Sequence, residues 1–192
     1  MILEGNEIGN GKKLAKHLLN VQENDHVEVH EVSGFISEDL TEALDEVDAI
    51  AKGTKCHKYL FAVSLNPPID EDAPISYFED AIAKIEKKLG LTGQPRVIVF
   101  HEKEGRRHAH VAWSRIDINT HKAINLPFYK RKLMDISHQL FLQHGWELPA
   151  GFKDRSLANP LNMSRGEWQQ AKRAKDDPQL LKQILIDAWE QS

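Results

Sequence analysis

The chain has little of what secreted and membrane proteins need. Its 192 residues contain one cysteine, Cys56, which allows no disulfide bond within the chain. No run of apolar residues approaches the roughly 18 that a membrane span requires. The N-terminus also lacks the basic and then apolar pattern of a secretory signal peptide. We therefore expect a cytoplasmic protein with no membrane partner.

An excess of positive charge is also missing. The formal net charge is −4, whereas proteins that bind nucleic acid without sequence preference are usually basic overall. The positive charge is instead concentrated in two short blocks, Lys103, Arg106 and Arg107 and then Lys130, Arg131 and Lys132. A local basic patch is able to steer a nucleic-acid strand into a cleft of an acidic molecule. The alternative is that both blocks are ordinary solvated surface.

The residues that are present suit one well-packed globular domain, with 41% apolar and 28% charged side chains. Hydrophobic spacings of three and four residues predict helices, and alternating or continuous apolar runs predict strands. The predicted helices cover residues 12–21, 38–52, 75–89 and 128–144, and the predicted strands cover residues 1–4, 27–30, 58–65, 96–101 and 107–118. We therefore expect an α+β domain with a mostly antiparallel sheet of about five strands covered by helices.

The last two predicted strands flank a short polar segment with Gly105, which is typical of an antiparallel hairpin. Successive side chains of a strand point to opposite faces, so His108 and His110 share a face. Any register that pairs His101 with either of them places all three imidazoles on that face. Three imidazoles with open coordination positions suit a divalent transition metal. The alternative is that they are ordinary strand histidines.

These residues resemble a known motif. The sequence of residues 101–110, H-E-K-E-G-R-R-H-A-H, follows the apolar strand V-I-V-F. It is similar to the third motif of relaxases, the mobilisation nucleases that nick plasmid DNA at a transfer origin. Relaxases carry an HUH-type site in which three histidines hold one metal ion, so the resemblance assigns the metal to His101, His108 and His110. It covers most of residues 1–152 and implies the helix-covered antiparallel fold of relaxases and related HUH nucleases.

The resemblance also implies a nucleophile near the N-terminus. Relaxases attack the DNA phosphodiester with a side chain, usually tyrosine, which leaves the 5′ phosphate covalently bound to the protein and a free 3′ hydroxyl. No tyrosine precedes Tyr59, but residues 14–20, L-A-K-H-L-L-N, resemble the first relaxase motif with His17 in place of the tyrosine. Some mobilisation relaxases use a histidine, and a neutral imidazole offers a lone pair near pH 7 without a strong base. We expect His17 to be the nucleophile, on the apolar stripe of its helix that faces the sheet.

Two alternatives to this assignment stay open. In the first, His17 is a buried histidine whose ring is satisfied by a backbone carbonyl. In the second, the nucleophile is Tyr129, because Y-K-R-K at residues 129–132 resembles the motif of replication-initiator HUH nucleases, in which the tyrosine follows the histidines.

The resemblance extends to two more residues. Ser64, in A-V-S-L-N-P-P, resembles the second relaxase motif, whose serine contacts DNA near the scissile phosphate. Glu104 lies between the histidines, where related proteins place an acid that orients a metal ligand or accepts a proton. A tight turn at Gly105 and Arg106 would direct Glu104 to the face opposite His101, and a wider loop would let it reach the site. Ser64 is therefore a candidate DNA contact and Glu104 a candidate catalytic residue. Further candidate DNA contacts are Arg106, Arg107, Lys130, Arg131 and Lys132.

Together these features predict a relaxase of plasmid conjugation with one divalent metal ion, most readily Mn or Mg, with Zn, Ni and Co also accepted by three imidazoles. The expected partners are single-stranded or melted origin DNA and accessory transfer proteins. One rival is an inactive origin-binding module on the same fold, and another is a metal-dependent hydrolase without a covalent step.

We expect the relaxase domain to cover residues 1–152 and a linker and helices to cover residues 153–192. The linker carries a turn signal at Asn159 and Pro160, and a capping box at residues 164–167 opens the next helix. The last predicted helix has Asp177 as its cap and Pro178 at its first position. Because the chain ends on a helix without a stop signal, we expect these residues to lead into a longer protein.

Overall fold

A computed structural model of the protein describes residues 1–22, 24–153, 161, 170–171, 173–174 and 177–190. The chain divides into two compact units, Met1–Trp146 and Glu147–Ser192. None of the helices in the described part of the chain is long and apolar enough to cross a membrane.

The first unit is built around a five-stranded sheet in which every neighbouring pair is antiparallel. The strand order is β1-β3-β5-β4-β2, so the hairpin of β4 and β5 lies inside the sheet. The strands are β1 (Ile2–Ile8), β2 (His26–Ser33), β3 (Leu60–Asn66), β4 (Arg96–Lys103) and β5 (Arg106–Ser114), followed by the small hairpin β6 (Ile116–Asp117) and β7 (Lys122–Ala123). The predicted antiparallel α+β architecture is therefore confirmed.

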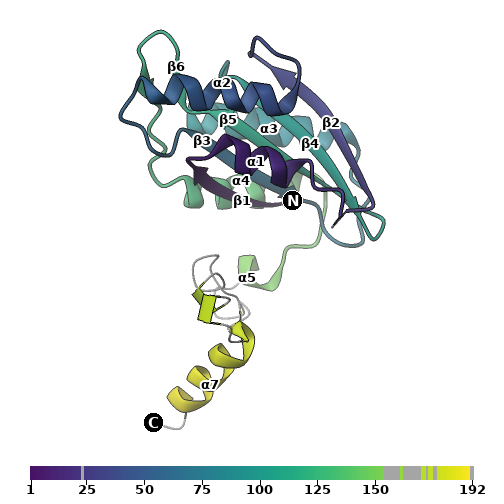
Figure 1. Ribbon diagram of the computed structural model, residues 1–192. Coiled ribbons are helices and arrows are strands. Elements are labelled where there is room, and N and C mark those ends of the chain that lie inside the picture. Colours follow the sequence, from purple (N-terminus) through teal and green to yellow (C-terminus); the bar gives the residue numbers. More distant parts are fainter. Residues whose placement is uncertain (23, 154–160, 162–169, 172, 175–176, 191–192) are drawn as a thin grey trace. The chain divides into compact units, whose positions relative to one another are not determined.

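Helices cover both faces of this sheet (Figure 1). The helices of the first unit are α1 (Gly11–Leu18), α2 (Leu40–Lys52), α3 (Ile75–Leu89) and α4 (Tyr129–Gln143). On one face, α1 and α2 share a buried core with Leu60, Val97 and Val99 of the central strands. On the other face, Phe78 of α3 packs edge-on against Phe100 of β4, with ring centroids 5.2 Å apart. Strands buried on both faces are apolar on both faces, which is why β3, β4 and β5 read as nearly continuous apolar runs.

Several predicted boundaries were wrong for identifiable reasons. The first strand continues to Ile8 through a predicted turn, because Gly5 leaves room for α4: a Cβ there would lie 2.6 Å from a methyl carbon of Leu133. The first helix ends at Leu18 and not at residue 21, and Val21 is 67% exposed. The predicted strand 107–118 breaks after Ser114.

The break after β5 is made by the buried side chain of Arg115. Its guanidinium donates hydrogen bonds to the carbonyl oxygens of Lys58, at 2.8 Å, and Ile124, at 2.9 Å, and forms an ion pair with Glu7. These partners lie far away in the sequence, so the strand pattern alone gives no sign of the interruption.

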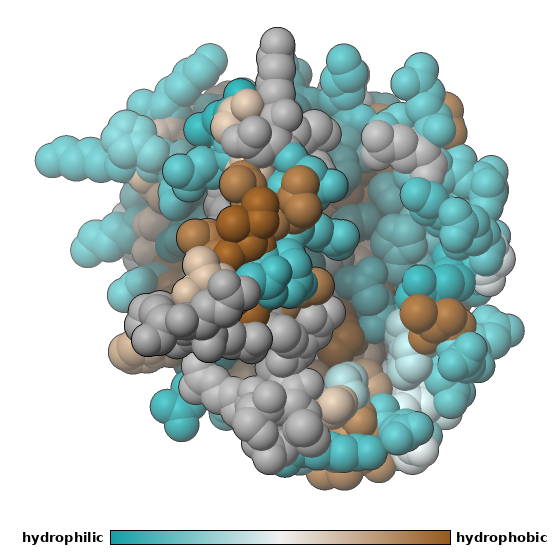
Figure 2. All heavy atoms as spheres, turned by 90° about the horizontal axis from the view of Figure 1, so that it is seen from below, coloured by the Kyte–Doolittle hydropathy of each residue, from teal (hydrophilic) through white to brown (hydrophobic). Residues whose placement is uncertain are grey.

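The second unit contains α5 (Ala150–Lys153) and α7 (Pro178–Glu190). The predicted cap of α7 is confirmed, because Asp177 Oδ1 accepts a hydrogen bond of 2.8 Å from the backbone N–H of Gln179. Several apolar residues of α7 are exposed, among them Leu180, Ile184 and Leu185. Figure 2 shows hydrophobic side chains, in brown, gathered at one place on the face of the protein that is seen there. The predicted turn at residues 159–160 and the capping box at residues 164–167 lie outside the described residues.

Candidate active site

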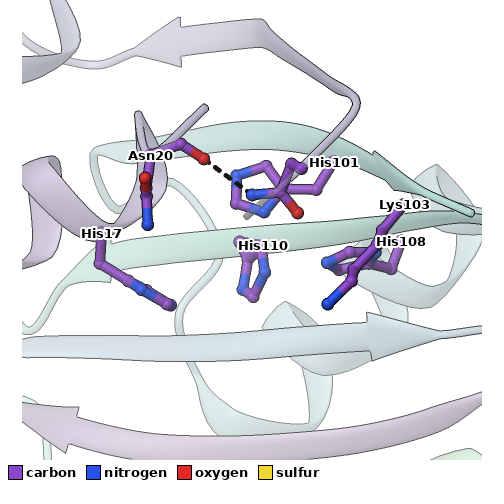
Figure 3. A pocket seen from close by; sticks show the side chains of 7 residues that line it. His17, Asn20, His101, Lys103, His108 and His110 are labelled. Carbon is purple, nitrogen blue, oxygen red and sulfur yellow. Dashed lines mark hydrogen bonds between the residues drawn. The ribbon is translucent and has the colours of Figure 1, made fainter. Parts of the chain in front are cut away.

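The register of the central hairpin brings three histidines together. His101 of β4 is paired directly with His108 of β5, and His110 is the next residue of β5 on the same face. Their rings lie 4.6 to 5.3 Å apart, measured between centroids. One ring nitrogen from each histidine lies within 4.8 Å of the other two. The predicted convergence on one face is therefore confirmed, and Figure 3 shows the three rings around one pocket.

The carbonyl group at the end of α1 fixes the orientation of His101. This ring is 2% exposed, and its Nε2 lies 2.7 Å from the backbone oxygen of Leu18. A carbonyl oxygen only accepts hydrogen bonds, so Nε2 carries the hydrogen and Nδ1 keeps its lone pair. A backbone partner of this kind is common for histidines that bind metals, because it sets both the tautomer and the ring plane.

Burial keeps the three imidazoles neutral. Burial, together with a smaller effect of the neighbouring His101, lowers the pKa of His108 to about 4 and that of His110 to about 3. Burial also lowers the pKa of His101. A neutral imidazole is the form that binds a metal. Three neutral nitrogen donors within reach of one another thus fit a single divalent metal ion.

His17 lies on the same pocket, but not on the apolar stripe of α1 as predicted. The buried side chains of α1 include Leu14, Ala15 and Leu18, and His17 is exposed beside them. Its ring meets that of His110 edge-on, with 5.7 Å between centroids. A residue adjacent to Leu18 points about 100° around the helix from it, which directs His17 toward the triad rather than into the core.

The pocket is a cavity of about 170 Å³ lined by His17, Asn20, Asn24, His101, Lys103, His108 and His110. Within the described ranges no carboxylate lines it. Asn24 Nδ2 donates a hydrogen bond of 2.8 Å to the backbone oxygen of Asn20, which closes the loop after α1 beside the triad (Figure 3).

The two asparagines were not predicted, because nothing in the sequence of that loop indicates its conformation. Lys103 was predicted only as part of a basic block. The strand period of two already places Lys103 on the face of His101.

The other predicted site residues are placed differently. Ser64 of β3 is paired directly with His110, on the histidine face. Tyr129 begins α4 on the opposite face, where its ring meets that of Phe61 edge-on at 5.1 Å. The structure therefore brings Ser64 to the triad and leaves Tyr129 on the other side of the sheet, together with residues 130–132 of the same helix.

The turn of the hairpin is tight, but it lies one residue earlier than the predicted tight turn at Gly105 and Arg106, so Glu104 lies in the turn itself. Glu104 and Gly105 are its two turn residues, with φ of 53° and 70°, as in a type I′ hairpin turn. Glu104 is exposed and does not line the pocket. Arg106 is exposed on the histidine face, whereas Arg107 points to the other face and forms an ion pair of 2.7 Å with Glu102.

Comparison with known proteins agrees with this geometry. No curated protein matches the chain. A family model described as "Relaxase: MobA/VirD2-like, nuclease domain" matches residues 14–146, which is more than half of the chain. The match begins within α1, which carries His17, and includes the whole histidine hairpin. The chain thus belongs to the MobA/VirD2-like relaxases, and residues 14–146 form a nuclease domain of the kind that nicks DNA in mobilisation.

Proposed function

We propose that this protein nicks and rejoins one strand of DNA at a plasmid transfer origin through a covalent intermediate on His17, and so begins conjugative mobilisation. The observation that carries the proposal is the pocket that His17 shares with the three neutral histidines of the hairpin. We assign the activity to residues 1–152, and single-stranded or melted origin DNA is the substrate. Accessory transfer proteins are the expected partners at the origin.

The proposed step transfers a phosphoryl group to a ring nitrogen of His17. A bond forms between this nitrogen and the phosphorus, and the bond from phosphorus to the 3′ oxygen breaks. The electron pair stays on the 3′ oxygen, which takes a proton from water, and the 5′ phosphate remains on the protein as a phosphoramidate. Because the intermediate keeps a reactive phosphorus bond, the free 3′ hydroxyl is able to reverse the step and rejoin the strand.

A histidine nucleophile suits a pocket without carboxylates. A tyrosine hydroxyl, with an ordinary pKa of about 10, has to lose a proton before it attacks, whereas a neutral imidazole already has a free lone pair. Tyr129, the alternative nucleophile, has its pKa raised by burial, with a further increase from Glu7, and its position on the other face also favours His17.

A divalent metal, Mn or Mg in the first place, would be held by His101, His108 and His110 and would neutralise the charge that builds on the scissile phosphate. Zn, Ni and Co fit the same donor set. Ser64 and Arg106 lie on the histidine face, so we propose that they contact DNA close to the scissile phosphate. Arg107 and the block Lys130, Arg131 and Lys132 lie on the other face, so their proposed contacts are with DNA outside the pocket. For Glu104 we propose an indirect effect, through the turn that positions His101 and His108.

The proposal is tested with the full chain, Mn²⁺ and single-stranded oligonucleotides tiled across a candidate origin, labelled at the 3′ end so that the strand that stays on the protein is visible. Denaturing gels then show any covalent adduct. We expect His17→Ala to abolish the adduct and Tyr129→Phe to retain it. His57→Ala is the matched control, because His57 is exposed in the loop before β3.

Three results would contradict the proposal. An undiminished adduct in His17→Ala would remove His17 as nucleophile. Binding of origin DNA without any adduct would favour an inactive origin-binding module. Repeated release of both DNA ends would indicate a hydrolase without a covalent step.

A further inference from the structure

The charge of the pocket comes from one side chain. Its lining consists of four histidines, two asparagines and Lys103. Among the described residues, Lys103 is thus the only lining side chain with a permanent charge. Since no carboxylate of the described residues lines the pocket, none of these residues offsets this charge before an anion enters.

The hairpin geometry aims Lys103 at the pocket. Lys103 follows His101 by two residues on β4, so both side chains project from the same face. The tight turn at Glu104 and Gly105 closes the ladder directly after Lys103, which is paired with Arg106. In Figure 3 the amine of Lys103 extends beside the ring of His108.

Two carboxylates near the turn, those of Glu102 and Asp25, are engaged elsewhere. Glu102 binds Arg107 on the opposite face of the sheet, with 2.7 Å between the charged groups. Asp25 accepts a hydrogen bond of 2.6 Å from the backbone N–H of Glu104. No ion pair found within the described ranges involves Lys103. Its ammonium group is therefore available to an anionic ligand.

We propose that Lys103 is a catalytic residue that binds a non-bridging oxygen of the scissile phosphate and stabilises the negative charge that develops there during transfer to His17. The inference rests on the proposed function and adds a residue to it. Lys103 acts through its positive charge. A cation held beside the scissile phosphate stabilises the negative charge that develops on its oxygens. A single ammonium group suits one phosphate oxygen, because lysine acts as a compact point charge.

Binding without metal tests the contact itself. The probe is an origin oligonucleotide whose scissile linkage is an uncharged methylphosphonate, compared with the ordinary phosphodiester and with a methylphosphonate two linkages away. We expect the wild-type chain to bind the scissile methylphosphonate on the order of tenfold more weakly than the diester, as for the loss of one hydrogen bond to a charged group. Lys103→Gln should bind both oligonucleotides with equal affinity.

The rate of adduct formation tests the role in catalysis. In single-turnover reactions with saturating Mn²⁺ and DNA, we expect Lys103→Gln to form the adduct on the order of 100-fold more slowly, as when one donor to a developing oxyanion is removed. Lys103→Arg keeps the charge and should retain most of the rate. Lys122→Gln is the control, because Lys122 is an exposed lysine of β7, beyond the other end of β5.

The outcomes separate this inference from the proposed function. If Lys103→Gln still distinguishes the two oligonucleotides and forms the adduct at the wild-type rate, the inference is wrong while the nuclease assignment stands. In another outcome, the wild-type chain forms no adduct but binds the diester more tightly than the scissile methylphosphonate, and Lys103→Gln binds both equally. The phosphate contact is then supported and the nuclease assignment falls. Equal binding of both oligonucleotides by the wild-type chain would overturn the contact.

Discussion

His110 lies at the centre of the pocket. Its ring centroid is 4.6 Å from that of His101, 5.1 Å from that of His108 and 5.7 Å from that of His17. We predict that His110→Ala weakens Mn²⁺ binding by at least about 100-fold. Removing even a residue that only hydrogen-bonds to a metal ligand lowers metal affinity by about 10- to 100-fold, and His110 would be a ligand itself. Isothermal titration calorimetry measures the change, and unaltered affinity in this variant would exclude the triad as the metal site. His57→Ala should bind Mn²⁺ like the wild-type chain.

The lowered pKa values of His108 and His110 predict how the metal-free protein responds to acid. Each ring has an ordinary pKa of about 6.5 when unfolded and a folded pKa of about 4 or about 3. As the pH falls, the unfolded chain takes up these protons at a higher pH than the folded chain does. The contribution of the two histidines to the free energy of unfolding is therefore highest above pH 6.5 and falls as the pH drops toward 4. Urea denaturation at pH 7, 6 and 5 measures this loss.

The glutamine variant His108→Gln provides the comparison for this pH dependence. Glutamine has no proton to gain in this range, so the variant should lose less stability than the wild-type chain between pH 7 and pH 5. Carboxylates elsewhere titrate alike in both proteins, and they cancel in the comparison. Parallel stability curves would contradict the assignment of the effect to His108.

At the scale of the elements, the hairpin turn positions Lys103 and the paired histidines His101 and His108. Gly105 has φ of 70°, and a Cβ added there would meet no atom within 4 Å. Gly105→Ala should therefore destabilise the fold through backbone strain alone, by about 1 kcal/mol. Urea denaturation measures the difference. Gly53→Ala is the matched control, because Gly53 has φ of −80° and should accept alanine without loss.

The sequence predicts this element well because strand geometry is repetitive. Once His101 is paired with His108, the period of two decides that His110 and Lys103 share their face, and no distant contact is needed. The tight turn was one of two open possibilities, since the choice depends on backbone angles at Glu104 that the residue type does not favour.

The end of α1 and the placement of His17 could not be predicted in the same way. The hydrophobic spacing continues to Val21, but the helix ends at Leu18, and the Leu18 carbonyl binds His101, which is 83 residues away. Asp25 then joins the loop to the backbone of Glu104. These contacts arise only in the folded chain, so spacing alone placed His17 on the apolar stripe of its helix.

At the scale of the whole molecule, a buried polar cluster joins the two central strands to α3 and the edge strand β2. Glu86 of α3 accepts hydrogen bonds from Trp113, at 2.8 Å, and from Arg96, at 2.6 Å. Arg96 also binds Glu31 of β2 at 2.8 Å. Glu86→Ala removes one of the two carboxylate partners of the half-buried Arg96 guanidinium and the acceptor of the Trp113 indole N–H. We therefore predict a loss of about 3 kcal/mol in the free energy of unfolding.

Thermal or urea denaturation checks this loss. The control is Glu79→Ala, because Glu79 is exposed on the same helix and a surface substitution usually changes stability by less than about 0.5 kcal/mol. Equal stability of the two variants would show that the cluster contributes little to the fold.

The molecule as a whole is acidic, and the positive charge that matters for the reaction is local. A net charge of −4 disfavours broad binding of DNA, while a pocket in which Lys103 lies beside the proposed metal site would attract one phosphate group. Specific capture of one phosphodiester is what a nicking enzyme needs, and the pocket holds His17 at the same place.

The most direct test of this account is to locate the covalent bond on the unmodified protein. After reaction with origin DNA and Mn²⁺, the chain is digested, and its nucleotide-bearing peptide is sequenced by mass spectrometry at neutral pH, because phosphoramidates are labile in acid. We predict that the nucleotide is attached to His17. A nucleotide attached to Tyr129 would contradict the assignment of the nucleophile, and a chain that nicks its DNA without carrying any nucleotide would contradict the covalent mechanism.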